Sequence, residues 1–311
     1  MLHLKKISDT IYMIQTKLRF ISMNNYLIFG GNSTILIDTG FVASKNEILK
    51  FFEQNKIELK EIDIILNTHC HLDHSGKNKF LKSQTNAKLM IHEQDRAAVE
   101  SFDGIKKQVG SFAEEYEEYW KQRLKWWNYE EGCKVDKTIT DNEIFDLGNH
   151  KLRVIYSPGH TLGHCCFLLD ENILVAGDMG FESLWYGNAR ASLLDYIKTY
   201  QRLISLDLKM VLSGHLDPVT DRIKERYEKR LSQLLERDNK ILDLIEKGHN
   251  TLEKLVKLHI TVKNRSVNLA DRLWQDYGEK NQISLHLNKL EQEGKITKIE
   301  DKIKGSRWKL V

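Results

Sequence analysis

The sequence predicts an α/β catalytic domain followed by a small α+β domain. Up to about residue 220, short apolar runs typical of strands alternate with helical patterns. One long charged helical pattern then covers 221–247, and three further helices with a closing hairpin suggest a winged helix. The net charge also changes sign, from −3 over residues 1–220 to +6 over residues 221–311, which suggests two modules.

The individual elements follow from local patterns. Gly30-Gly31-Asn32 marks a hairpin turn between two apolar runs. In the first 220 residues we expect strands at 10–15, 25–29, 33–38, 62–66, 89–91, 143–147, 152–155, 165–169, 173–176 and 210–212, and helices at 45–55 and 192–205. In the last part we expect a connecting helix within 221–248 and a winged helix over 249–311, with helices at 251–259, 267–276 and 282–293 and strands at 295–300 and 307–311.

Residues 93–130 interrupt the alternation of strands and helices with a polar, mostly helical segment. Its aromatic side chains are Phe112, Tyr116, Tyr119, Trp120, Trp126, Trp127 and Tyr129. Tyr116, Trp120 and Leu124 recur at helical spacing, which favours packing for most of these side chains. We expect one or two of them to line a substrate pocket, so that the insert acts as a lid. The same surface is also a candidate interface for a homodimer.

Composition excludes several classes of protein. No apolar run is long enough for a transmembrane helix, so no membrane partner is expected. The first twelve residues lack the apolar block of a signal peptide. Four cysteines, of which Cys165 and Cys166 are adjacent, do not make a disulfide framework in 311 residues. These features together favour a cytoplasmic protein.

The segment His69-Cys70-His71-Leu72-Asp73-His74 is the densest group of candidate metal ligands. It follows the apolar strand at 62–66, and side chains at a strand end can be held facing one point, as a metal requires. His69 and His71 can share one ion, while Asp73 and His74 can reach a second. The side chain of Cys70 is expected to point away.

Further candidate ligands stand after three later strands. His160, Asp178 and His215 each have a glycine beside them, which permits tight turns and close backbone approach. Because each follows a strand, we expect all three at the same edge of the sheets as the first segment. His164 either supports a ligand or packs in the core, and the other six histidines are expected to be ordinary core or surface residues.

With these motifs, residues 1 to about 218 resemble the metallo-β-lactamase superfamily. The candidate ligands match its five metal motifs in order, and Asp38 matches an early acidic motif. The resemblance implies an αββα sandwich of two mixed sheets with helices outside. It further implies one metal held by His69, His71 and His160, a second held by Asp73, His74 and His215, and Asp178 as the bridge between them.

Those ligands imply the chemistry. Two divalent ions close together share a hydroxide that attacks a carbonyl or a phosphorus atom, so no protein nucleophile is needed. Asp178 is then the key carboxylate, and Asp73 can accept a proton from the attacking water. The nitrogen-rich set favours two Zn²⁺ ions, with Mn²⁺ or Fe²⁺ as alternatives.

The C-terminal pattern, including residues 283–296 and 308–310, resembles a lactamase-like subfamily that carries a winged helix. That subfamily includes a single-strand-specific endoribonuclease, and its bacterial members are mostly glyoxalase II-like hydrolases. We favour hydrolysis of a small-molecule thioester, ester or lactone. The less favoured alternative is cleavage of single-stranded RNA with help from the winged helix, which has 13 basic and 8 acidic residues from residue 251 onward. Under the favoured hypothesis, deleting 249–311 is expected to leave hydrolysis nearly intact.

Overall fold

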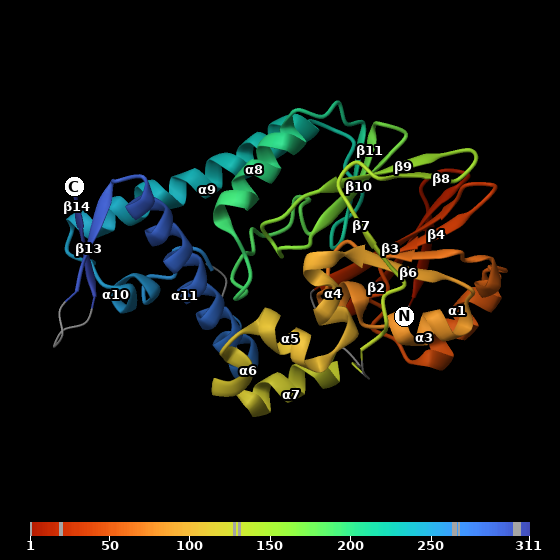
Figure 1. Ribbon diagram of the computed structural model, residues 1–311, viewed down its shortest axis with the longest axis horizontal. Coiled ribbons are helices and arrows are strands. Elements are labelled where there is room, and N and C mark those ends of the chain that lie inside the picture. Colours follow the sequence, from red (N-terminus) through yellow and green to blue (C-terminus); the bar gives the residue numbers. More distant parts are fainter. Residues whose placement is uncertain are drawn as a thin grey trace.

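The computed structural model describes residues 2–18, 21–126, 129, 132–262, 266, 268–300 and 306–311. Two mixed sheets pack face to face, and helices cover their outer surfaces (Figure 1). One sheet has seven strands in the order β1 to β7, and the other has five in the order β12-β11-β10-β9-β8. This is the αββα sandwich that the sequence predicts.

The seven-stranded sheet begins with antiparallel strands and ends with parallel ones. Its strands are β1 His3–Lys6, β2 Ile11–Leu18, β3 Ile21–Phe29, β4 Thr34–Ile37, β5 Ile64–Leu66, β6 Lys88–His92 and β7 Lys137–Ile139. β1 to β4 pair antiparallel, whereas β4 to β7 pair in parallel. The edge strands β1 and β7 are additional to the prediction, because short and largely exposed strands carry little apolar pattern.

The five-stranded sheet carries most of the later candidate ligands. It consists of β8 Ile144–Asp146, β9 Lys151–Tyr156, β10 Cys165–Leu169, β11 Ile173–Gly177 and β12 Met210–Ser213. β8 to β11 pair antiparallel, and β12 joins β11 in parallel. The strands predicted in this region are all present, with ends that differ by a few residues.

Helices cover the outer faces of both sheets. The first sheet is covered by α1 Lys45–Gln54, α3 Asn78–Gln84 and α4 Glu93–Glu100, with the 3-10 turn η1 Leu59–Glu61 before β5. The second sheet is covered by α8 Leu193–Ile204 and α9 Ile223–Glu246. Between the sheets lies a core to which both contribute, including Tyr26, Ile35, Val154 and Phe167. Because both faces of each sheet are buried, the ends of the strands are held rigidly.

The insert is helical, as predicted, within the described residues. After α4 it forms α5 Phe102–Val109, α6 Phe112–Glu115 and α7 Glu117–Trp126. Phe112 and Trp120 are buried in one hydrophobic cluster with Tyr116 and Leu124 partly buried against it, so the helical spacing does reflect packing. Trp127, which the sequence places in the same segment, lies outside the described residues.

The C-terminal part contains α10 Leu252–Val256, α11 Leu269–Gln292 and the hairpin β13 Ile296–Ile299 with β14 Arg307–Leu310. The prediction of separate helices at 267–276 and 282–293 is wrong, because α11 is one helix of 24 residues through Gly278. Gly278 packs against Trp185 and Gly187, and buried Glu279 accepts hydrogen bonds from the backbone of Thr261, so tertiary contacts stabilise the helix across this point.

The two halves of α11 belong to different cores. Leu273, Trp274 and Tyr277 pack against the insert helices, while Ile283 and Leu287 pack with the hairpin and α9. α11 therefore connects the C-terminal hairpin to α6 and its neighbours, as Figure 1 shows in blue and yellow. Among the described helices, none combines the length and hydropathy that a bilayer span requires.

Candidate metal centre

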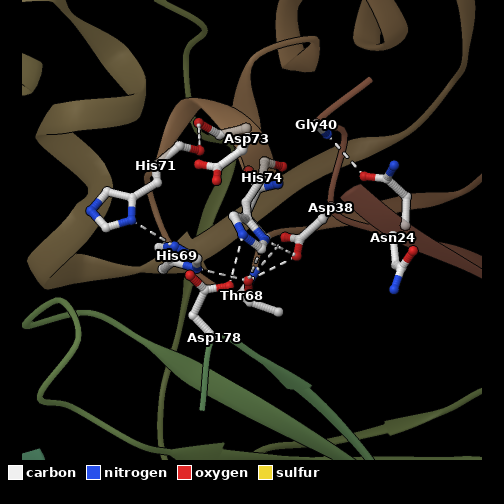
Figure 2. A network of polar contacts seen from close by, with 12 residues as sticks. Asn24, Asp38, Gly40, Thr68, His69, His71, Asp73, His74 and Asp178 are labelled. Carbon is white, nitrogen blue, oxygen red and sulfur yellow. Dashed lines mark hydrogen bonds and ion pairs between the residues drawn. The ribbon is translucent and has the colours of Figure 1, made fainter. Parts of the chain in front are cut away.

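The first candidate ligands lie where β5 ends. His69 and His74 are buried, and His71 and Asp73 stand beside them at the start of α2 (Leu72–Ser75). Asp38 at the end of β4 fixes this loop from behind. Its carboxylate accepts hydrogen bonds of 2.8 Å from the backbone nitrogen and the hydroxyl of Thr68, and one of 2.8 Å from His74 Nδ1. Figure 2 shows these side chains converging on Asp178.

The structure brings together all seven side chains that the sequence singles out. One group contains His69, His71, His160 and Asp178, and a second contains Asp73, His74 and His215; within each group the candidate ligand atoms lie within 4.8 Å of one another. In the first group, His71 Nδ1 lies 2.9 Å from both His69 Nε2 and His160 Nε2. These ring nitrogens therefore face one point.

Asp178 lies between the two groups. Its Oδ1 is 3.0 Å from His74 Nε2 and 3.1 Å from His215 Nε2, and its Oδ2 is 3.2 Å from His160 Nε2. Oδ1 is buried and makes no hydrogen bond of acceptable geometry to any described group. A buried carboxylate oxygen without a donor, surrounded by imidazole nitrogens, fits a place where divalent cations bind.

The outer ring nitrogens determine which inner nitrogens can act as ligands. Each outer nitrogen has a fixed partner: His74 Nδ1 with Asp38, His160 Nδ1 with the Trp185 carbonyl at 2.7 Å, His215 Nδ1 with the Ser22 carbonyl at 2.6 Å, and His69 Nδ1 with Thr68 Oγ1 at 3.0 Å. Carbonyl and carboxylate oxygens only accept, so three of these rings carry a proton on Nδ1. Their Nε2 lone pairs can therefore point at a metal.

Asn188 and Asp95 are functional residues that the sequence analysis missed. The side-chain nitrogen of Asn188 lies 2.7 Å from His71 Nε2. If the amide is flipped, its oxygen takes this position and accepts a hydrogen bond from a proton on His71 Nε2. The buried Asp95 carboxylate accepts from Cys70 N, Thr161 Oγ1 and Gly163 N, so it ties the loop of His71 to the loop of His160. No local pattern in the polar helix α4 marks Asp95 for this role.

The remaining histidines and Cys70 have other roles. His164 supports a ligand: its Nε2 accepts from the Asp178 backbone nitrogen at 3.2 Å, and its Nδ1 lies 3.0 Å from Ser157 Oγ. Burial lowers the pKa of His164, which keeps that nitrogen free to accept. Cys70 is buried in the core outside both groups. His286 is more than an ordinary core residue, because it links Asp238 to the hydroxyl of Tyr186.

Charge in the cluster is unevenly distributed between the groups. Burial, and after it the charge of His160, lowers the pKa of His71 to about 3. Burial also acts to lower the pKa of His215, but the charge of Asp178 outweighs it and raises that pKa to about 9. Burial and the Asp178 charge raise the pKa of Glu182, which accepts from the His215 backbone nitrogen, to about 7. The second group thus carries positive charge that cations would replace.

A cavity of about 690 Å³ opens onto five of these ligands, namely His71, Asp73, His160, Asp178 and His215. Trp120 of the insert also lines it. Trp120 is thus an insert aromatic that borders the cavity, while a lid role for the insert stays a prediction.

Comparison with known proteins accounts for this arrangement. The profile of the Metallo-beta-lactamase superfamily matches residues 19–215, which include all seven candidate ligands. The chain belongs to the metallo-β-lactamase superfamily. It is therefore a metal-dependent hydrolase, and members of this superfamily typically bind divalent metals.

Individual members of the superfamily are similar over different shares of the chain. The metallo-beta-lactamase fold-containing protein ST1585 of Sulfurisphaera tokodaii is 28% identical over 213 residues, 66% of this chain and 77% of that protein. A hydroxyacylglutathione hydrolase of Maricaulis maris is 30% identical over 118 residues, 38% of this chain and 33% of that enzyme. The crystal structure of the metallo-beta-lactamase family protein TTHA1429 from Thermus thermophilus covers 98% of this chain and all of its own, with a TM-score of 0.73 and 22% identity. At that identity the likeness shows the fold alone.

Proposed function

We propose that the protein hydrolyses a thioester, ester or lactone at a centre of two divalent metal ions, zinc in the first place. The observation that carries this proposal is the position of Asp178, whose carboxylate touches His160 on one side and His74 and His215 on the other. When bound, two divalent ions lower the pKa of a water molecule and polarise a carbonyl oxygen.

The candidate ligands would have different roles in metal binding and proton transfer. His69, His71 and His160 would hold one ion and Asp73, His74 and His215 the other, with Asp178 contacting both. Of the two candidate carboxylate ligands, Asp73 is the more exposed, with 19% of its side chain accessible against 14% for Asp178. Because it faces the cavity, Asp73 is the group we assign to accept a proton from the attacking water.

Two observations support an acyl substrate. The relative from Maricaulis maris is named for hydrolysis of a hydroxyacylglutathione, although the matched region is only part of each chain. The cavity also has an apolar share that includes Ile105, Val109 and Trp120, which suits a carbon chain or ring. We therefore place small-molecule acyl compounds ahead of other substrates.

The endoribonuclease alternative gains no support from the C-terminal helix. Near the C-terminal end of α11, His286 and Lys289 are buried, and Lys289 is paired with Asp238 and Glu293. A lysine neutralised in this way is a poor contact for phosphate.

A cytoplasmic location remains part of the proposal. All four cysteines are free and buried, as is usual in a reducing compartment.

Parallel assays test the function. Zinc- and manganese-loaded protein is incubated with S-acyl thioesters and with labelled single-stranded RNA, and metal content is measured by elemental analysis. We expect about two ions per chain from the seven ligands, thioester cleavage, and loss of both metal and activity in His71→Ala. One ion or fewer with no gain on adding zinc would contradict the dinuclear centre, and cleavage of RNA alone would contradict the substrate class.

A further inference from the structure

We infer that the cavity binds its substrate in one direction, with a bulky apolar acyl group against α5, α7 and α11 and a polar leaving group against β2 and β3. The inference rests on the proposed hydrolysis and adds to it the class of acyl group. It also assigns the C-terminal helix α11 to substrate binding.

One wall of the cavity is mostly apolar, although Gln108 of α5 also lines it. Five of the residues that line the cavity belong to a single hydrophobic cluster built from three separate parts of the chain: Leu72, Ile105, Val109, Trp120 and Trp274. Trp185 extends this wall, because its ring stacks on Trp274 with centroids 5.9 Å apart. An extended surface of this kind binds hydrocarbon better than it binds polar groups.

The C-terminal helix completes the apolar wall. Trp274 packs edge-on against Phe112 of the insert, with ring centroids 5.0 Å apart. The Trp185 ring lies so close to α11 that a Cβ added at Gly278 would be 2.2 Å from its Cη2 atom. Only a glycine at this position lets the ring sit beside the helix, so the wall depends on α11 being present.

The wall formed by β2 and β3 is polar. Gln15, Lys17 and Ser22 line the cavity there, with Asp217 from the loop after β12. The wall is braced by Asn24, whose amide accepts from Gln15 Nε2 at 3.0 Å and donates to the Leu216 carbonyl at 2.7 Å. Lys17 and Asp217 place charged groups on this side of the cavity, which suits a polar, hydrogen-bonding leaving group.

The candidate metal centre lies between the two walls. His71 immediately precedes Leu72 of the apolar wall, whereas His215 donates to the Ser22 carbonyl of the polar wall. A carbonyl held near Asp178 therefore has its acyl side toward the tryptophans. The volume of 690 Å³ accommodates about 20 non-hydrogen atoms, at roughly 30 Å³ for a water-sized group, so an acyl chain of several carbons fits beside a leaving group.

A series of acyl thioesters with one fixed polar thiol tests the direction of binding. We expect kcat/KM of the zinc-loaded full chain to rise from acetyl to octanoyl by about 4-fold per methylene, the factor that corresponds to ~0.8 kcal/mol per buried CH₂. A second series keeps the acetyl group and lengthens the alkyl chain of the thiol, and it is expected to show no such rise. A flat acyl series, or a rise confined to the thiol series, would overturn the inference.

Paired tryptophan variants link the effect to α11. Trp274→Ala is expected to reduce the octanoyl-to-acetyl ratio of kcat/KM at least about tenfold, since most of the contact with the chain is lost. The control Trp308→Phe changes a tryptophan of the same C-terminal region that lies in the other core, and the ratio is expected to stay unchanged. Equal ratios in both variants would contradict a role for α11.

Direct binding separates this inference from the proposed function. Octanoate and acetate are titrated into the zinc-loaded protein, followed by calorimetry, and octanoate is expected to bind at least about 100-fold more tightly. If no thioester is hydrolysed, the proposed function fails. Tight binding of octanoate that is weakened in Trp274→Ala would then still support the apolar wall. If thioesters are hydrolysed but octanoate binds no better than acetate, the proposed function stands and the inference is overturned.

Discussion

Replacing Asp38 with asparagine is expected to weaken the second metal site while the fold survives. Asp38 Oδ1 accepts from the Thr68 backbone nitrogen, and the asparagine oxygen can keep that bond. Its Oδ2 accepts from both Thr68 Oγ1 and His74 Nδ1, and an NH₂ group in that place can only donate. His74 must then either leave its Nδ1 proton unpaired or move the proton to Nε2, the nitrogen that faces Asp178.

The size of the effect follows from the one charged hydrogen bond that cannot be replaced. A hydrogen bond to a charged group contributes roughly 1.5–3 kcal/mol. If the loss of this bond shifts the proton of His74 to Nε2, metal affinity decreases by about 10- to 100-fold. This is the usual range when the outer hydrogen-bond partner of a metal-binding histidine is removed. The backbone at Asp38 has a φ of +63°, a conformation that asparagine tolerates well, so no further backbone cost arises.

Zinc titration of the metal-free protein, followed by calorimetry, measures this effect site by site. We expect one of the two binding steps to lose affinity in Asp38→Asn, with a smaller change in the other step. Asp136→Asn is the matched control, because Asp136 also accepts from a backbone nitrogen, that of Leu89, but lies outside the candidate metal groups. Unchanged affinity for both ions in Asp38→Asn, or an equal loss in the control, would refute the reasoning.

Three further outcomes are expected. Asp178→Asn should lower kcat by at least about 100-fold with little loss of folding, and steady-state kinetics that retain most activity would exclude it as the bridge. Deleting residues 249–311 should lower the octanoyl-to-acetyl ratio of kcat/KM at least about tenfold, because Trp274 is removed with them, while acetyl thioesters are still hydrolysed; an unchanged ratio in a folded, metal-loaded truncation would contradict this. Zinc binding below pH 9 should release protons, because the pKa of His215 is raised to about 9. As the pH is lowered below 9, zinc affinity should fall by about tenfold per pH unit for each competing proton, which calorimetry in several buffers measures.

The raised pKa of His215 also affects the metal-free protein. A histidine that binds its proton more tightly when folded stabilises the fold below its ordinary pKa of 6.5, and that contribution is lost as the pH rises toward 9. His71 acts in the opposite sense, because its pKa is lowered to about 3 and its contribution is lost as the pH falls below 6.5. Thermal denaturation of the metal-free protein across pH 5–9 should therefore show greatest stability near the middle of this range.

The sequence patterns alone indicated most of the strands and the candidate ligands, and the resemblance to the metallo-β-lactamase superfamily implied the sandwich. Apolar runs of four or five residues indicate buried strands, and a ligand directly after such a run is placed at the sheet edge by the strand itself. For this reason the sequence places four candidate ligands at one edge of the sheets: His69, His160, Asp178 and His215. Asp38 was also found, because it ends a strand and matches a motif.

Only the tertiary structure decided how the C-terminal part is used. The sequence predicts two helices at 267–276 and 282–293, but contacts of Gly278 with Trp185, more than 90 residues earlier in the chain, accompany one continuous helix α11. Asp95 and Asn188 act on the ligand loops through hydrogen bonds to residues distant in sequence, and Trp274 reaches the cavity because the insert packs on α11. Local sequence patterns indicate which backbone conformation a segment favours, but not which distant segment will pack against it. The apolar wall of this cavity is made of such distant contacts.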